Sequence, residues 1–261
     1  MIRRQLYTEV RVSRLAILSR RIAGFSLPVV LLAIGMHRFG LLEYEVAFAI
    51  LLAGLAVALV GVLVAGLAFI VIWNEGLRGL DRALMACAIG VVVLGVPAFD
   101  LARGAVLPAI SDISTDVNDP PGFQAIASAR ARGANPVVYP GREAATLQRA
   151  AYPGVKAFEV EANSDEMFNL ALQIVEANRW RVLDSVSPRG GERDGRIEAV
   201  AQSLIMGFRY DVSIRVRTTP NGVRVDMRSA SRYGTRDFGS NARRIVRYFA
   251  DFTDVRRRAS R

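Results

Sequence analysis

The feature that most constrains this chain is a long apolar run that contains no charged residue. The run extends from Val46 to Trp73. A helix needs about 20 apolar residues to cross the hydrocarbon core of a bilayer, and this run is longer than that. The run therefore predicts a transmembrane helix and indicates an integral membrane protein.

Two further apolar segments lie on either side of this run. The segment 83–99 is nearly as apolar, and Pro97 near its end is tolerated where neighbouring helices supply hydrogen-bond partners. The segment from Ile22 to Met36 contains Pro28 and is shorter than the usual span of about 20 residues. We expect it to span as well, over 22–42, because flanking leucines and snorkelling arginines extend its reach.

The prediction is thus a transmembrane region over residues 1–104, with spans at 22–42, 46–73 and 83–99. No Asp, Glu or Lys lies at mid-membrane depth, so transport through these helices alone is not expected. Glycines in the second and third spans either allow close approach of the helices or are simply small residues in an alanine-rich bundle. These glycines are Gly54, Gly61, Gly66, Gly90 and Gly95.

The placement of arginines predicts how the chain crosses the membrane, because positive residues accumulate in cytoplasmic loops. Arginines precede the first span and also lie between the second and third spans. They are Arg3, Arg4, Arg11, Arg14, Arg20 and Arg21, then Arg78 and Arg82. We therefore expect a cytoplasmic N-terminus in a bacterial inner (plasma) membrane. An odd number of spans then places the C-terminal domain in the periplasm.

Composition excludes several classes of function. The net charge of +10 comes almost wholly from arginine, because Lys156 is the only lysine. Such a charge suits anionic lipid or nucleic acid, but no nucleic-acid reading element is recognisable, so the lipid bilayer is the expected partner. Cys87 is the only cysteine and His37 the only histidine, which excludes an intramolecular disulfide and argues against triad catalysis. No cofactor and no metal are expected.

Residues 105–155 are predicted to form a proline-rich linker and covering segment, since their prolines favour turns and short helices. Asp112, Asp116 and Asp119 in this segment suggest a calcium site. The stretch lacks the loop glycine and the distal glutamate of an EF-hand, however, so we interpret the three as acidic turn residues.

Residues 156–261 show the patterns of a soluble α+β domain. Alternate residues of the strand 208–218 are apolar, with polar residues between them, and the strand 223–231 repeats this pattern with Arg224, Asp226 and Arg228 outward. Two amphipathic helices can cover the apolar face, giving an antiparallel sheet covered by two helices, a two-layer sandwich behind an N-terminal membrane helical bundle. Strands are predicted at 157–161, 180–186, 196–203, 208–218 and 223–231, and helices at 164–178, with Asn163 as N-cap, and 238–257.

Asn221–Gly222 is a strong signal for a two-residue hairpin turn. A turn with this dipeptide at its tip places Arg217 opposite Asp226. The alternative register places Arg217 opposite Arg224. Opposite charges stabilise cross-strand pairs, so we predict the register that pairs Arg217 with Asp226.

Three stretches carry a resemblance to a known family. They are Asp112–Asp116 with Pro120–Phe123, then Ala151–Gly154, and finally Asp226–Gly234 continued by Asp237, Gly239, Asn241–Arg243 and Ile245. They resemble a bacterial and plastid family known as domain-of-unknown-function family 1499, over roughly residues 111–252. The segment before Asp211 departs from the family pattern, because Arg209 and Tyr210 precede Asp211 where an acidic pair is expected. The resemblance implies a domain often found behind membrane helices, and it implies no activity.

A polar cluster is expected where the last strand ends and the last helix begins, and it is the candidate ligand-binding site. Helix N–H groups and arginines at such a place can bind an anion. In the alternative interpretation Asp237 caps the helix, Arg232 pairs with Asp211, and the serines satisfy the backbone. The cluster comprises Arg228, Ser229, Ser231, Arg232, Asp237 and Asn241.

The segment Leu204–Phe208 is an uncharged hairpin tip. On a domain tethered beside a bilayer, such a tip can contact lipid or a partner protein. The alternative is that it packs beneath the proline-rich linker, where its side chains would belong to the core.

The leading hypothesis is a non-enzymatic, membrane-anchored envelope module whose extracytoplasmic domain binds an anionic lipid or another envelope protein. The alternative is a hydrolase of envelope lipids or glycans that uses carboxylates such as Asp211, Asp226 and Asp237 as acid and base. No catalytic residue is assigned, because no pattern places two of these carboxylates around a cleft.

Overall fold

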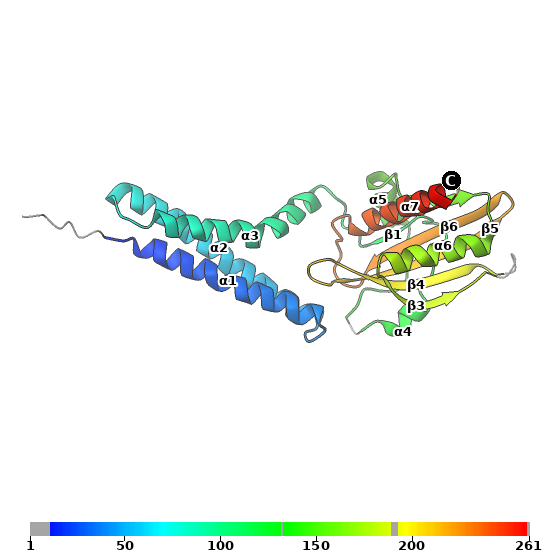
Figure 1. Ribbon diagram of the computed structural model, residues 1–261, viewed down its shortest axis with the longest axis horizontal. Helices are drawn as coiled ribbons and strands as arrows, with labels where there is room; N and C mark the ends of the chain where they lie inside the picture. Colours follow the sequence, from blue (N-terminus) through cyan, green and yellow to red (C-terminus); the bar gives the residue numbers. More distant parts are fainter. Residues whose placement is uncertain (1–10, 132, 189–192, 260–261) are drawn as a thin grey trace, which may run out of the picture. The chain divides into compact units, whose positions relative to one another are not determined.

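The computed structural model describes residues 11–131, 133–188 and 193–259. By its internal contacts the chain divides into two units, Met1–Ala102 and Arg103–Arg261, and Figure 1 labels their helices and strands. Arg3 and Arg4, two of the arginines on which the predicted orientation rests, lie outside the described residues.

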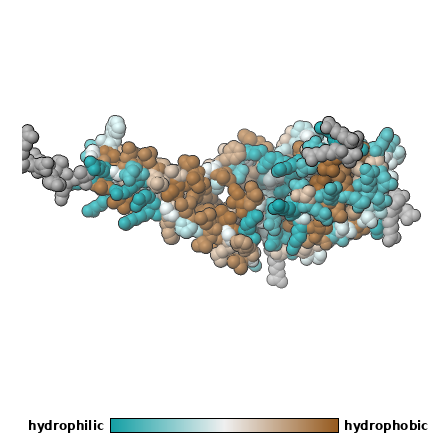
Figure 2. Space-filling model, in the orientation of Figure 1, coloured by the Kyte–Doolittle hydropathy of each residue, from teal (hydrophilic) through white to brown (hydrophobic). Residues whose placement is uncertain are grey.

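The first unit consists of long apolar helices: α1 (Arg14–Arg38), α2 (Tyr44–Glu75) and most of α3 (Leu80–Ala105). Among the described residues, these three helices are long and apolar enough to cross a membrane. Figure 2 shows hydrophobic side chains over much of their outer surface. The chain is therefore an integral membrane protein, as the apolar runs predict. The first span was predicted at 22–42, whereas α1 begins at Arg14 and ends at Arg38, so Leu41 and Leu42 do not extend it.

The segment before α1 lies beside the loop between α2 and α3. Val12 and Arg78 form an isolated parallel bridge. The Ser13 N–H donates to the Arg78 carbonyl at 2.9 Å, and the Arg78 N–H donates to the Arg11 carbonyl at 3.0 Å. Arg11 and Arg78 therefore belong to the same end of the helical unit, and both segments face the same side of the membrane.

Helices α1 and α2 pack through small residues that recur in steps of three, four or seven. Such steps keep the residues on one stripe of each helix, and small side chains let two backbones approach closely. The buried residues are Ala16, Ser19, Ala23, Ser26, Val30 and Ala33 in α1, and Ala47, Gly54, Ala58, Gly61, Ala65 and Ala68 in α2.

Close approach of the helices is confirmed at Gly54, Gly61 and Gly90, where an added Cβ would overlap atoms of a neighbouring helix. At Gly66 and Gly95 an added Cβ would meet nothing within 4 Å. Glycine is thus required sterically at the first three positions and is only a small residue at the other two.

Gly61→Ala is expected to destabilise the helical unit, because its Cβ would lie 2.8 Å from the backbone nitrogen of Ala23. Overpacking costs about 1–3 kcal/mol, more than the roughly 0.5–1 kcal/mol by which alanine favours a helix interior over glycine. Gly66→Ala is the matched control and should be neutral or stabilising. Unfolding of both proteins in detergent titrated with SDS measures the difference, and equal stabilities would contradict the packing.

The second unit is built on an antiparallel sheet with the strand order β1-β6-β5-β4-β3. Strand β2 also pairs with β6, beside residues 223–225, whereas β1 lies beside residues 228–230. Strands β2 to β6 begin and end within one residue of the predicted bounds. The strands are β1 (Asp112–Ser114), β2 (Phe158–Val160), β3 (Arg181–Val186), β4 (Gly195–Gln202), β5 (Arg209–Thr219) and β6 (Gly222–Ser231).

Helices α6 (Ser164–Ala177) and α7 (Ser240–Ala259) cover one face of the sheet (Figure 1). The Asn163 side chain caps α6 as predicted, by accepting the Asp165 N–H at 2.8 Å. The apolar stripes of both helices pack on the apolar sheet face, so the predicted two-layer α+β sandwich is confirmed. The core includes Met167, Ile174, Ile197, Val212, Ile214, Val225, Met227, Ile245, Tyr248 and Phe252.

The opposite face of the sheet is covered by residues 115–131 and 133–137, which follow β1 and include α4 (Ala125–Ala129); they are named here the covering segment. Asp226 and Arg228, predicted to point outward, are buried beneath it, as are Asp211 and Ser213. The prediction that Asp226 and Arg228 point into solvent is therefore wrong. The alternation of a strand shows that one face of the sheet is apolar and the other polar, but it does not show whether another segment covers the polar face.

The β5–β6 hairpin does not adopt the register predicted from charge, so that prediction is wrong. Thr219 pairs with Gly222, and Arg217 lies opposite Arg224, so the two residues of the turn are Pro220 and Asn221. Proline has no N–H to donate to a strand ladder. The observed register leaves Pro220 in the turn, whereas the predicted one would place it inside the ladder.

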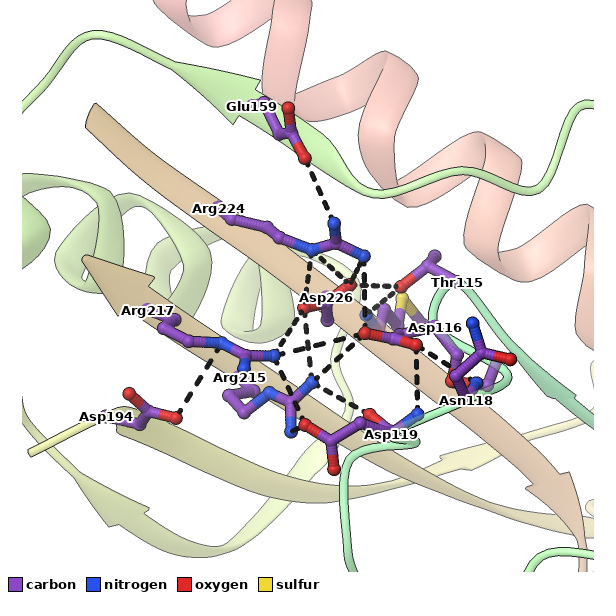
Figure 3. A network of polar contacts seen from close by, with 12 residues as sticks. Thr115, Asp116, Asn118, Asp119, Glu159, Asp194, Arg215, Arg217, Arg224 and Asp226 are labelled. Atoms are coloured by element: carbon purple, nitrogen blue, oxygen red, sulfur yellow. Dashed lines mark hydrogen bonds and ion pairs between the residues drawn. The ribbon is translucent and has the colours of Figure 1, made fainter. Parts of the chain in front are cut away.

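Carboxylates offset the repulsion between the two facing arginines, as Figure 3 shows. Asp226 lies 3.1 Å from Arg224 and 3.6 Å from Arg217. From the covering segment, Asp116 lies 3.4 Å from Arg224, and Asp119 lies 3.4 Å from Arg217. All three aspartates that suggested a calcium site are engaged by arginines, because Asp112 also lies 2.6 Å from Arg228.

Candidate functional site

The predicted polar cluster is divided between the two faces of the sheet. Successive residues of a strand point to opposite faces. Ser229 and Ser231 therefore face α7, whereas Arg228 and Arg232 face the covering segment. The structure brings the serines, Asp237 and Asn241 together and places the two arginines apart from them.

Arg228 and Arg232 are buried in ion pairs. Arg228 donates to both oxygens of Asp112, at 3.0 and 2.6 Å, and its guanidinium lies 4.3 Å from the centre of the Phe123 ring. Arg232 donates to Asp211 at 2.9 and 2.8 Å, so the pairing proposed as the alternative interpretation is confirmed. Their side chains are 3% and 2% exposed.

On the helix side, Ser229, Ser231 and Asn241 form a hydrogen-bonded group. The Ser229 hydroxyl donates to Asn241 Oδ1 at 2.8 Å, and Asn241 Nδ2 donates to Ser231 Oγ at 3.0 Å. Arg244, which the predicted cluster did not include, donates to Ser229 Oγ at 3.0 Å and to Asn241 Oδ1 at 2.7 Å. Its guanidinium stacks 3.9 Å from the Tyr210 ring centre, and burial lowers the pKa of Arg244.

Asp237 caps the N-terminus of α7. Its carboxylate accepts the Gly239 N–H at 2.9 Å and the Asn241 N–H at 2.8 Å. Burial raises the pKa of Asp237, and these two hydrogen bonds act in the opposite direction. The capping role that the sequence offered as an alternative is confirmed.

An open cavity of about 830 Å³ lies beside α7. Among the described residues, its lining includes four arginines and no aspartate or glutamate. Aromatic side chains supply much of the remaining wall. The arginines are Arg103, Arg243, Arg244 and Arg247, and the aromatic residues are Tyr152, Trp180 and Tyr248.

The cavity arginines come from two distant parts of the chain. Arg243 and Arg247 are exposed and lie four residues apart on α7, so they share one side of the helix. Arg243 donates to the Phe238 carbonyl at 3.0 Å. Arg103 belongs to the last turn of α3. In the sequence the α7 arginines look like the solvated side of an amphipathic helix, so they were not predicted as site residues. The only sequence signal for them was their four-residue spacing beside the apolar stripe of the helix.

The hydroxyl oxygens of Tyr152 and Ser240, which also line the cavity, are shielded from solvent and have no hydrogen-bond partner among the described residues. A buried hydroxyl without a partner costs free energy. Burial raises the pKa of Tyr152, so its hydroxyl stays protonated. Each of these two residues beside the cavity therefore has an unused hydroxyl donor.

The carboxylates considered for hydrolysis lie elsewhere. Asp211 and Asp226 are buried and paired with arginines, and Asp237 caps α7. As far as the described residues extend, none of the three lines the cavity.

These features define a membrane-anchored α+β domain with a cationic cavity. A family model described as "Protein of unknown function (DUF1499)" matches residues 112–252, more than half of the chain. The chain therefore belongs to this family, as the three resembling stretches indicated. The match runs from β1 into α7 and so includes the α7 arginines, whereas Arg103 precedes it. No curated protein matches the chain.

Arg228→Ala is expected to destabilise the domain by about 3–5 kcal/mol, because it leaves a buried carboxylate without its counter-charge. Burial already raises the pKa of Asp112 above its ordinary value of 3.8, and Arg228 opposes that rise. The variant should therefore raise the pKa of Asp112 further. A carboxyl group whose pKa is higher in the folded than in the unfolded state takes up a proton on folding. The variant should therefore regain stability as the pH falls from the pKa of Asp112 in the folded state toward its pKa in the unfolded state.

Denaturant unfolding of the full chain in detergent, at neutral and at acidic pH, measures this effect. Arg247→Ala is the control, because its side chain is exposed and such substitutions usually change stability by less than about 0.5 kcal/mol. A deficit in Arg228→Ala that is independent of pH would contradict the role of Asp112.

Proposed function

We propose that this protein is a non-enzymatic, membrane-anchored module of the bacterial envelope whose domain binds the headgroup of an anionic lipid in the cavity beside α7. The observation that carries the proposal is the charge of the cavity: arginines line it and, within the described part of the chain, no carboxylate does. Guanidinium groups bind phosphate and carboxylate through paired, charge-assisted hydrogen bonds. The hydroxyls of Tyr152 and Ser240 add neutral donors.

A lipid is favoured over a free anion by the connectivity of the chain. Arg103 lies in the last turn of α3, a helix long and apolar enough to cross the membrane. The cavity is thus tied to the headgroup layer by the chain itself, which raises the effective concentration of lipid around it. The apolar part of the lining, such as Leu107 and Val246, suits the region of a lipid next to its headgroup.

The proposed orientation has the N-terminus in the cytoplasm and the domain in the periplasm. Arg11 and Arg78 lie at one end of the helical unit, and both belong to the arginine-rich segments that favour the cytoplasmic side. Three spans then carry the domain to the other side of the membrane.

Arg243→Gln combined with Arg247→Gln is expected to weaken binding of anionic lipid. Each lost charged hydrogen bond costs about 1.5–3 kcal/mol, or tenfold or more in affinity. Native mass spectrometry of the full chain, released from nanodiscs that contain phosphatidylglycerol and phosphatidylcholine, counts the retained anionic lipid. Arg142→Gln combined with Arg181→Gln is the matched control, because both residues are exposed outside the cavity and the charge change is equal.

Equal lipid retention by the two double variants would contradict the cavity as the site. Inorganic phosphate, titrated into the wild type in phosphatidylcholine nanodiscs, distinguishes the two sources of the anion. Tight binding of phosphate without retention of phosphatidylglycerol would assign the cavity to a free anion.

The orientation is tested with single cysteines in a Cys87→Ser background. Asn221→Cys in the β5–β6 turn should react with a membrane-impermeant maleimide in spheroplasts, and Asn74→Cys near the end of α2 should react only after lysis. Both positions are exposed, so the two variants serve as controls for each other. The reverse pattern would place the domain in the cytoplasm.

A further inference from the structure

The connection between β4 and β5 ends in an exposed apolar tip. The Leu204 side chain is 88% exposed and Ile205 is 49% exposed. The turn is well defined, because the Ser203 N–H donates to the Phe208 carbonyl at 2.9 Å and the Phe208 N–H donates to Ser203 Oγ at 2.9 Å. Leu204 therefore does not pack beneath the proline-rich linker, which was one of the two interpretations of the sequence.

The tip lies at the end of the sheet at which the chain enters the domain. Gln202 in β4 pairs with Arg209 in β5, Tyr210 pairs with Ser231 in β6, and Ala230 pairs with Asp112 in β1. Neighbouring strands are about 4.8 Å apart, so the tip and the start of β1 are separated by roughly 15 Å across this end of the sheet. At this end of the sheet the strands therefore lie in the order β4, β5, β6 and β1.

The residues before β1 are fixed to the same end of the domain. Arg236 Nη1 donates to the carbonyls of Gly104 and Leu107, at 3.2 and 3.3 Å. The Asp237 N–H donates to the Ile110 carbonyl at 3.3 Å. Hydrogen bonds therefore attach the residues at and just after the end of α3, which ends at Ala105, to this end of the domain.

We propose that Leu204 and Ile205 insert into the boundary between headgroups and acyl chains of the bilayer, as a second membrane contact of the domain. The occupant of the tip is the bilayer itself, because the chain enters this end of the sheet directly after a membrane-spanning helix: α3 ends at Ala105 and β1 begins at Asp112. The segment 203–208 carries no charge, and Arg209 next to it is exposed. An apolar group flanked by a cation is the arrangement that favours a membrane interface.

The insertion is independent of the cavity, since no residue of the tip lines it. It has a separate consequence: two anchors, α3 and the tip, restrict rotation of the domain about a single tether. A protein partner is the competing occupant, and it is absent from a purified, reconstituted sample.

The experiment uses the full chain with Cys87→Ser, so that an introduced cysteine is the only one. Leu204→Cys carries an environment-sensitive nitrobenzoxadiazole label, in vesicles of phosphatidylcholine and phosphatidylglycerol with doxyl-labelled acyl chains. Asn221→Cys is the matched control at the opposite end of β5. That strand has 11 residues, which at about 3.3 Å per residue separates its ends by roughly 33 Å.

The expected result is blue-shifted, doxyl-quenched emission from position 204 and unquenched emission from position 221. No quenching at 204 would show that the tip stays in water and would overturn the proposal in favour of a protein partner. Equal quenching at both positions would also overturn it. Adding Ile205→Asp to the Leu204→Cys variant should abolish the quenching, and quenching that persists would show that the label alone enters the lipid.

Discussion

Buried ion pairs on the polar face of the sheet hold β1 and the covering segment in place, and the domain depends on this contact. Asp112 in β1 pairs with Arg228 in β6 at 2.6 Å, and Arg130 near the end of the covering segment pairs with Asp211 at 2.8 Å. Charges withdrawn from water stabilise a fold only when their geometry is good and their other groups are satisfied. Here Asp211 also accepts from Arg232, so one carboxylate joins two distant segments.

The same contact positions the features that point to function. By pairing β1 with β6, it brings the chain that leaves α3 to the end of the sheet where α7 begins. Arg103 and the α7 arginines therefore meet around one cavity, and the β4–β5 tip lies at the same end of the sheet. Cavity, tip and membrane tether are the features from which we propose a role at the headgroup layer of a bilayer.

The polar cluster and the hairpin show where local patterns mislead. Ser229 and Arg228 are adjacent in sequence, yet alternation along β6 sends them to opposite faces, where one bonds Asn241 and the other Asp112. In the hairpin, the charge pairing that favoured the predicted register was outweighed by Pro220. A missing N–H inside a ladder leaves a backbone carbonyl without its partner, whereas Asp226 can approach Arg224 in either register.

The sequence by itself determined the spanning helices, the bounds of β2 to β6, the cap at Asn163 and the apolar face of the sheet, because each follows from local periodicity or local hydrogen bonding. Only the tertiary structure decided that the polar face is buried and that Arg103 meets Arg243 in a cavity. These depend on the path of β1 and the covering segment, which is set by ion pairs between residues more than a hundred positions apart, such as Asp112 and Arg228. No periodicity in the sequence encodes contacts at that separation.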